Sequence, residues 1–190
     1  AGHEIAWDLA KGMVTFDSHP VILAWRDSTA AGLIGGLYEA VGPQRLALAM
    51  QARGRESVEM DWQIISRHED FAKGFETIAE IAATAGWGRW ELLNVDTPAR
   101  QATFRGLDTW EGHMQKSLDL CWGSAMLAGK LAGYCTRLWN VNCWAVQVKY
   151  IARGDDCDEF IVRPSDRTME SEIASLLQTD QATRADMAVA

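Results

Sequence analysis

Residues 123–162 read GSAMLAGKLAGYCTRLWNVNCWAVQVKYIARGDDCDEFIV, and this stretch decides the fold that we predict for the chain. Its first half repeats apolar residues at the i, i+4, i+7 and i+11 spacing of one helical stripe. The stripe consists of Leu127, Leu131, Tyr134 and Leu138. A ridge of small residues lies on the adjacent surface, at Ala125, Gly129, Ala132 and Gly133. Because small residues let another backbone come close, this helix is predicted to have two packing faces.

The second half of the stretch changes to a period of two, which is typical of a half-buried strand. Asn140 can take the left-handed conformation that ends a helix, so the strand is predicted to begin soon after it. One side of the strand holds Trp144, Val146, Val148 and Tyr150, and the other holds Cys143, Ala145, Gln147 and Lys149. Turn chemistry at residues 153–156 and an apolar run at residues 159–162 predict a returning strand.

Length and composition bound the kind of protein. A chain of 190 residues with 48% hydrophobic content can bury about 70% of its unfolded surface, which is enough for one domain with a real core. No apolar run is long enough to cross a membrane and no cleavable signal is visible, so we expect a soluble, cytoplasmic protein without a membrane partner. With 18 basic and 26 acidic side chains, direct binding to nucleic acid is not expected.

The first half of the chain is predicted to be a short β extension followed by helices. Residues 4–8, 13–16 and 21–25 have strand patterns, and Ser28 is predicted to cap the first helix. Gly42-Pro43 ends that helix and starts the next. Further apolar faces at helical spacing follow, and residues 66–69 match a capping box that opens a helix with Phe71 and Phe75.

The second half returns to strands. Residues 87–95 and 101–105 flank a turn that contains Pro98, so they predict an antiparallel hairpin. Residues 108–111 match a second capping box, which begins a short helix. The last segment carries Met169, Ile173 and Leu176 at helical spacing. Since an isolated helix is marginal in water, we expect it to pair with a symmetry mate or to precede another domain.

These elements predict an α+β fold, in which an antiparallel sheet packs against a helical layer, with an N-terminal β extension and a projecting C-terminal helix. The predicted units are residues 1–27 as the extension, residues 28–163 as the main domain, and residues 164–190 as a linker helix toward an effector domain.

Several motifs make the chain resemble the 4-vinyl-reductase domain family, the small-molecule-sensing input domain of phenol- and xylene-responsive bacterial regulators. The strongest are GKLAGY at residues 129–134 and, after a strand, GDDCDEF at residues 154–160. The stretches VILA at residues 21–24 and LYEAVGPQR at residues 37–45 are also similar to the family's opening. The resemblance covers about residues 20–163 and implies a homodimeric sensor that passes ligand occupancy to an attached effector domain.

The resemblance has one departure, at a structural zinc site of the family. The four ligand places there hold Ser124, Gln147, Tyr150 and Asp158 in this chain. A hydroxyl, an amide and a phenol are poor zinc ligands at neutral pH, so we expect no metal. Cys121 and Cys157 lie near two of these places, which leaves a shifted site as the alternative. As thiols without a C-x-x-C pairing, they are expected to be reduced and to act as small hydrophobes.

The resemblance also implies where a ligand would bind, in the concavity between sheet and helices. The candidate ligand-binding residues are Trp87, Trp90, Phe104, Trp110, Trp122 and Tyr134. Aromatic walls suit a flat apolar or aromatic ligand, and an indole N–H or a phenol O–H can orient a polar substituent. The alternative is that these rings fill the core. His113 can hydrogen-bond a ligand hydroxyl, or it can be a locally satisfied surface side chain.

Three functional classes remain open. A ligand-binding sensor is favoured by the resemblance, the aromatic residues and the C-terminal helix. A pigment- or small-molecule-processing enzyme is the second class, because the family takes its name from a vinyl reductase. We find no nucleotide-binding glycine pattern and no catalytic arrangement, so we expect no enzyme and no cofactor. The third class is a ligand-free scaffold that dimerises through the ridge of small residues.

Overall fold

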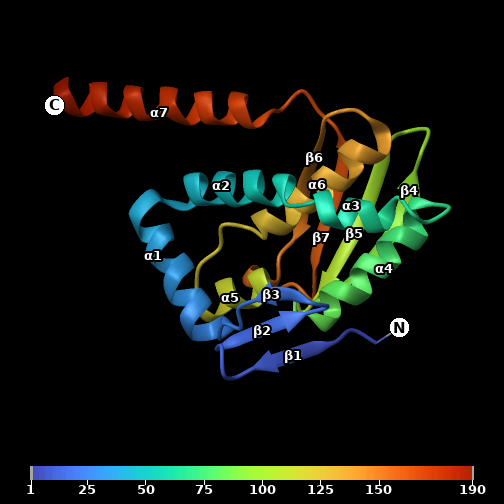
Figure 1. The fold of residues 1–190 in the computed structure, drawn as a ribbon. Coiled ribbons are helices and arrows are strands. Elements are labelled where there is room, and N and C mark those ends of the chain that lie inside the picture. The colour runs from blue at the N-terminus through green and yellow to red at the C-terminus, as the bar shows by residue number, and fades with distance from the viewer. Residues whose placement is uncertain (1, 190) are drawn as a thin grey trace.

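A computed structural model describes residues 2–189 of the chain, with side chains for residues 2–179. The elements follow in the order β1 (Ile5–Asp8), β2 (Met13–Phe16), β3 (His19–Val21), the π-helical segment η1 (Arg26–Ala30), α1 (Ala31–Val41), α2 (Pro43–Glu56), α3 (Glu59–Ile65), α4 (Phe71–Thr84), β4 (Arg89–Asp96), β5 (Gln101–Leu107), α5 (Trp110–Ser117), α6 (Ala125–Trp139), β6 (Cys143–Lys149), the 3-10 turn η2 (Ile151–Arg153), β7 (Asp158–Pro164) and α7 (Met169–Val189). Figure 1 shows their arrangement.

The predicted α+β class is confirmed. The main sheet has four strands in the order β4-β5-β7-β6, and every neighbouring pair is antiparallel. Both predicted hairpins are therefore present, and β5 and β7 join them into one sheet. Phe104 of β5 lies opposite Phe160 of β7, and both side chains are fully buried. The core lies where this face of the sheet packs against α4 and α6 (Figure 1).

The helix that the opening stretch predicts is α6, and it has the two expected packing faces. Leu127, Leu131 and Tyr134 are buried in the core. On the other face, a Cβ atom on Gly129 would lie 2.2 Å from the carbonyl oxygen of Gln51. The ridge of small residues therefore packs against α2 within the same chain. The ridge is therefore covered by α2 and does not form the dimer interface that the scaffold alternative placed there.

Strand β6 buries Trp144 but turns the other two residues of that side, Val146 and Val148, outward. Val146 and Val148 are 42% and 44% exposed, whereas Cys143 and Ala145 are buried against the helices. Because alternate residues of a strand point to opposite faces, the pairing of β6 with β7 decides which set is buried. The buried set has small side chains, which leaves room for α6 to lie close to the sheet.

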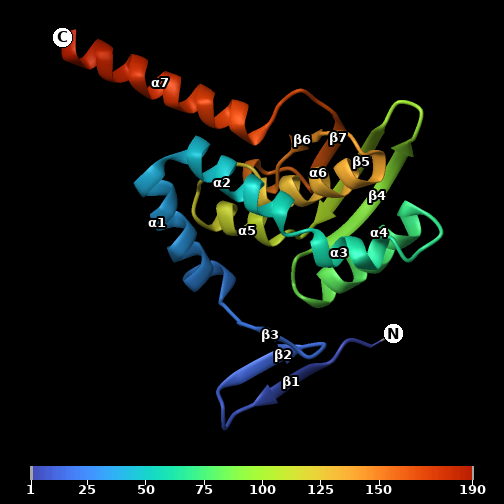
Figure 2. The same cartoon turned by 45° about the horizontal axis from the view of Figure 1, so that its top comes forward.

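The N-terminal extension is a three-stranded sheet in the order β1-β2-β3. Its third strand is His19–Val21 and not residues 21–25 as predicted. Asp17 and Ser18 both have positive φ angles, of 47° and 68°. Two such residues make a tight hairpin turn, so the returning strand begins at His19. This sheet stands clear of the main body in Figure 2.

Three predicted helix caps were placed at the wrong residue. Ser28 lies inside η1, which begins after Trp25 without a side-chain cap. Helix α4 is capped by Asp70, whose carboxylate accepts a hydrogen bond from the Lys73 amide, because residues 66–68 form the turn that ends α3. Helix α5 is capped by Thr109, since Asp108 has a φ of 54° and cannot take the extended conformation of a cap.

Helix α7 leaves the main domain, and Figure 1 shows it running along α2 and beyond. Its apolar stripe faces α2: Met169, Ile173 and Leu176 line a groove together with residues of that helix. Within the described part of the chain, no helix is long and apolar enough to cross a membrane.

Candidate functional site

An apolar cavity of about 150 Å³ lies between α4, α6 and the start of β4. Its wall consists of Asp61, Phe75, Ile78, Ala79, Ile81, Ala82, Ala85, Trp87, Trp90, Leu127, Lys130, Leu131 and Tyr134. Most of these side chains are aliphatic or aromatic, and only Asp61 and Lys130 carry charge. The cavity is thus apolar except where Asp61 and Lys130 form a polar end.

The sequence of α4 explains why space remains there. Phe75, Ala79 and Ala82 follow one another at the i, i+4 and i+7 positions that share a helix face. Alanine side chains are too short to reach α6 across the gap between the two helices. The cavity therefore exists because this face of α4 carries methyl groups beside its larger side chains.

A tight turn places the two tryptophans at the cavity. Gly86 and Gly88 both have positive φ angles, and a Cβ atom on Gly88 would lie 2.9 Å from the Leu107 carbonyl oxygen. Between them, the Trp87 amide donates a hydrogen bond to the Ala82 carbonyl at 2.8 Å, which fastens the turn to α4. The Trp90 indole N–H then donates to the Trp87 carbonyl at 3.3 Å. Both tryptophans are therefore fixed in the cavity wall.

The polar end consists of three side chains that meet at one oxygen atom. Asp61 Oδ2 accepts a hydrogen bond from the Tyr134 hydroxyl at 2.5 Å and one from Lys130 Nζ at 2.6 Å. Lys130 Nζ also lies 5.4 Å from the centre of the Trp87 ring, within the range of a cation–π contact. The side chains of Lys130 and Asp61 are only 15% and 25% exposed.

The charges at this end are largely withdrawn from solvent. Burial raises the pKa of Tyr134 well above its usual range, and the negative charge of Asp61 raises it further. The phenol is therefore neutral at physiological pH and acts as a hydrogen-bond donor to Asp61.

The structure places the six predicted ligand-binding residues in three environments. Trp87, Trp90 and Tyr134 line the cavity. Phe104 is buried behind it, with its ring centre 5.0 Å from that of Phe75. Trp110 packs edge-on against Trp87 at 5.9 Å but is not part of the wall.

Trp122 lies elsewhere, in a second hydrophobic cluster, where its ring contacts Tyr38 at 5.6 Å. His113 is also not part of the cavity wall. Its Nε2 atom lies 3.2 Å from an oxygen of Asp108, which is the locally satisfied arrangement that we considered as the alternative.

Sequence reasoning missed Asp61 and Lys130. Lys130 had a signal, because it lies three residues after Leu127 and four before Tyr134 and so falls within the apolar stripe of α6. A lysine on that face is unusual and points to a buried partner. Asp61 had no comparable signal, since its position depends on how α3 approaches α6.

The four places at which the family carries zinc do converge in this structure. Ser124 Oγ donates to Asp158 Oδ2, and Gln147 Nε2 donates to Asp158 Oδ1, each at 2.8 Å. The Tyr150 hydroxyl donates to the Gln147 carbonyl at 2.9 Å. Asp158 also accepts from Thr109 Oγ1, and from the Ile151 amide. A hydrogen-bonded cluster thus occupies the place of the metal.

These donors do not fit zinc. The Asp158 carboxylate already accepts four hydrogen bonds, and the other donors are an amide and hydroxyls. Among residues 2–179, no three His, Cys, Asp or Glu side chains come together as a possible metal site. Cys157 is buried and Cys121 is half-buried, and both are free thiols.

A second buried carboxylate, that of Glu111 in α5, lies next to the N-terminus of α6. It accepts hydrogen bonds from the amides of Met126 and Leu127, at 3.2 Å and 3.0 Å, so it caps the helix that carries Lys130 and Tyr134. Complete burial raises the pKa of Glu111 to about 8, and the nearby Asp158 contributes to this increase.

Comparison with solved structures shows that this fold occurs in a sensory domain of a transcription activator. That activator is PoxR, and its phenol-responsive sensory domain was solved with phenol. The two structures have a TM-score of 0.69 at 19% sequence identity, and the match covers 90% of each chain. Subunit 3 of the trafficking protein particle complex from Naegleria fowleri, covalently bound to palmitic acid, has a TM-score of 0.49 at 14% identity, covering 72% of this chain and 93% of that one. At 19% identity, the likeness to the PoxR domain establishes the fold alone.

No protein-family model and no curated protein matches the sequence. The 4-vinyl-reductase label therefore stays an expectation from the residues, while the sensory-domain fold is shared.

Proposed function

We propose that this chain is a ligand-binding sensor domain that takes a small apolar or aromatic molecule into the cavity between α4, α6 and β4. The observation that carries the proposal is the cavity itself. Its volume of about 150 Å³ is that of apolar protein cavities that accept a molecule of benzene size. A single-ring ligand therefore fits the space, with Trp87, Trp90 and Tyr134 as its aromatic contacts.

Two further observations support the proposal. The PoxR sensory domain, which shares the fold, is described as responsive to phenol and was solved with it. The resemblance of the GKLAGY and GDDCDEF motifs to input domains of bacterial regulators points the same way. Phe104 packs against Phe75 and Trp110 packs against Trp87, so these two rings support the cavity wall from outside, whereas Trp122 does not contribute to the proposed site.

The test is a binding titration with single-ring compounds, followed by tryptophan fluorescence and calorimetry. Ala82→Phe places a ring in the cavity and should abolish binding, because the ligand and the new side chain need the same space. Ala83→Phe is the matched control, since Ala83 is the next residue of α4 and is exposed. Equal binding by the two variants would refute the proposed site.

In the proposed sensor, contacts between helices connect the ligand cavity to α7. Helix α6 forms one wall of the cavity and touches α2 through Gly129. Helix α2 in turn faces the apolar stripe of α7 across a groove of about 350 Å³. Because that groove is not filled, α7 has room to shift. We therefore propose that α7 conveys occupancy to an effector domain in the full-length protein.

Hydrogen exchange of the α7 amides, with and without ligand, tests this route. A shift in the equilibrium between two states requires that the ligand prefer one of them. We expect ligand-dependent protection in residues 169–179, with Ala82→Phe as the control that cannot bind. If exchange in α7 does not change when a ligand is bound, the cavity remains a ligand site but the proposed role of α7 in signalling is wrong.

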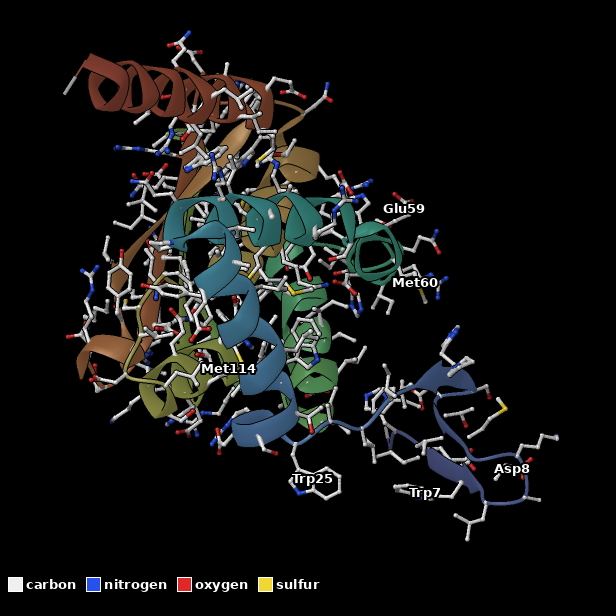
Figure 3. All side chains as sticks on the ribbon, turned by 90° about the vertical axis from the view of Figure 1, so that its left-hand side faces the viewer. Trp7, Asp8, Trp25, Glu59, Met60 and Met114 are labelled. Carbon is white, nitrogen blue, oxygen red and sulfur yellow. The ribbon has the colours of Figure 1, made fainter. Side chains whose placement is uncertain are left out.

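The proposed sensor acts as a homodimer. The N-terminal sheet and the segment after it expose large apolar side chains: Trp7 is 59%, Trp25 77% and Ile22 95% exposed. Figure 3 shows Trp7 and Trp25 away from the body of the domain. Large apolar side chains that gather in one exposed segment are typical of a protein interface. A second copy of the chain is the partner that we propose.

The enzyme alternative makes a different prediction for the same cavity. A sensor returns its ligand unchanged, whereas a reductase consumes it in the presence of a reduced nicotinamide. Mass spectrometry of the ligand after incubation separates the two. We propose no catalysis, because the sequence has no nucleotide-binding glycine pattern and a sensor needs only to bind its ligand.

A further inference from the structure

We propose that Asp61 and Lys130 form a polar subsite that selects ligands by one neutral group able both to donate and to accept a hydrogen bond, such as a hydroxyl or a carboxamide on a single ring. This inference rests on the proposed function, since it concerns the ligand of the same cavity. It goes further by naming the two residues that read the ligand's substituent and the ligands that they reject.

The polar end of the cavity has unused hydrogen-bonding capacity. Both hydrogen bonds to Asp61 within the described residues go to Oδ2, so Oδ1 has no donor there. Lys130 has three N–H bonds and uses one of them on Asp61. Because Asp61 and Lys130 both line the cavity, this acceptor and the remaining Lys130 donors belong to side chains of its wall.

Keeping this ion pair in an apolar cavity costs desolvation free energy. Removing two charges from water is expensive, and hydrophobic replacement of a buried ion pair is often neutral or stabilising. Aliphatic side chains at positions 61 and 130 would fit a hydrocarbon ligand better. The pair is also not the sole ion pair between the two helices, because Arg137 of α6 and Glu59 of α3 form a second one at 2.7 Å, outside the cavity wall. Hydrogen bonding to a ligand explains why this ion pair is present in an apolar cavity.

The ion pair favours a ligand whose substituent is neutral. Asp61 and Lys130 together are neutral, so a charged substituent would be attracted by one of them and repelled by the other. It would also lose its hydration on entering the cavity. A neutral hydroxyl or carboxamide avoids both effects, because it can donate to Asp61 Oδ1 and accept from Lys130 Nζ. The Tyr134 hydroxyl keeps Asp61 in place by binding Oδ2.

The experiment compares two matched pairs of ligands by calorimetry on the 190-residue chain. Phenol and toluene differ by a hydroxyl against a methyl group, and benzamide and benzoate differ by a neutral group against an anion. We expect phenol to bind at least tenfold more tightly than toluene, and benzamide at least tenfold more tightly than benzoate.

Two variants assign the selectivity to the pair. Asp61→Asn keeps the size of the side chain but leaves Lys130 without a counter-charge, so benzoate should gain at least tenfold relative to benzamide. Lys130→Met keeps the length of the side chain and should remove the preference for phenol over toluene. Glu59→Gln is the control: it removes the other ion pair between α3 and α6 and should leave both ratios unchanged. Glu59 points outward from α3 in Figure 3.

The outcomes separate this inference from the proposed function. If none of the four compounds binds, the proposed single-ring ligand is wrong and the inference falls with it. If all four bind with similar affinity, the cavity is a ligand site but the polar subsite is refuted. If Asp61→Asn and Glu59→Gln change the ratios alike, the effect comes from helix packing and the inference is again refuted.

Discussion

Gly129 of α6 and Gln51 of α2 touch backbone to backbone: a Cβ atom on the glycine would lie 2.2 Å from the glutamine carbonyl oxygen. The contact is reciprocal one turn away, where a Cβ atom on Gly54 would lie 2.1 Å from the Met126 carbonyl oxygen. Backbone atoms on both sides cannot move aside as a flexible side chain can. The cavity wall and α2 therefore shift together or not at all.

Gly129→Ala should lower the free energy of unfolding by about 3 kcal/mol, because the added methyl group has to force the two helices apart. Urea denaturation measures this loss. Gly36→Ala is the matched control, since nothing lies within 4 Å of a Cβ atom there and the residue is also helical. Alanine at that position should stabilise the chain by up to about 1 kcal/mol. Equal effects of both substitutions would contradict the close contact.

Asp158→Ala should destabilise the chain by about 3 kcal/mol or more, because Thr109, Ser124 and Gln147 lose their acceptor in a buried place. A chelator should leave the thermal midpoint of the wild-type chain unchanged, since hydrogen bonds join these positions. Differential scanning calorimetry measures both effects. A midpoint that falls on chelation and recovers with added zinc would overturn this account.

Stability should fall as the pH rises from about 5 to 8, because of Glu111. Its pKa in the folded chain is raised to about 8, whereas an unfolded glutamate has a pKa of about 4.3. Between these values the folded state binds the extra proton, so the free energy of unfolding decreases with pH. Below the unfolded pKa the contribution is fully present.

Glu111→Gln should flatten this dependence, since glutamine does not titrate. Urea denaturation at several pH values, for the wild-type chain and the variant, measures the difference in slope. A wild-type slope equal to that of the variant would show that the carboxyl is already ionised in the folded state.

Replacing Trp7 and Trp25 together by serine should convert the proposed dimer into a monomer, because both indoles are exposed on one chain and are expected to be covered by the second. Sedimentation velocity gives the mass in solution. Met60→Ser is the control, since Met60 is an equally exposed apolar residue on α3 (Figure 3). A wild-type monomer would remove the dimer from the proposed function.

Much of the fold was predictable because it depends on local patterns. The stripe through Leu127 and Leu131 and the left-handed residue Asn140 mark α6 without reference to any other element. The two hairpins follow from alternating residues and turn chemistry. The caps of α4 and α5 were less predictable, since several neighbouring polar residues compete for one position and backbone geometry selects among them.

Half of the candidate ligand residues line the cavity, and the reason is physical. Trp87 and Trp90 lie beside a glycine turn that directs them to α4, and Tyr134 lies on the buried stripe of α6. Phe104 and Trp122 are aromatic as well, but composition does not distinguish a ring that faces a void from one that faces other side chains.

By itself, the sequence determined the elements of this protein: the α+β class, the antiparallel hairpins and the two-faced helix. Only the tertiary structure decided which side of β6 is buried, how α3 brings Asp61 to Lys130, and where α4 leaves a cavity. Local patterns act within a few residues along the chain, whereas a cavity and an ion pair between helices depend on distances between segments far apart in the sequence.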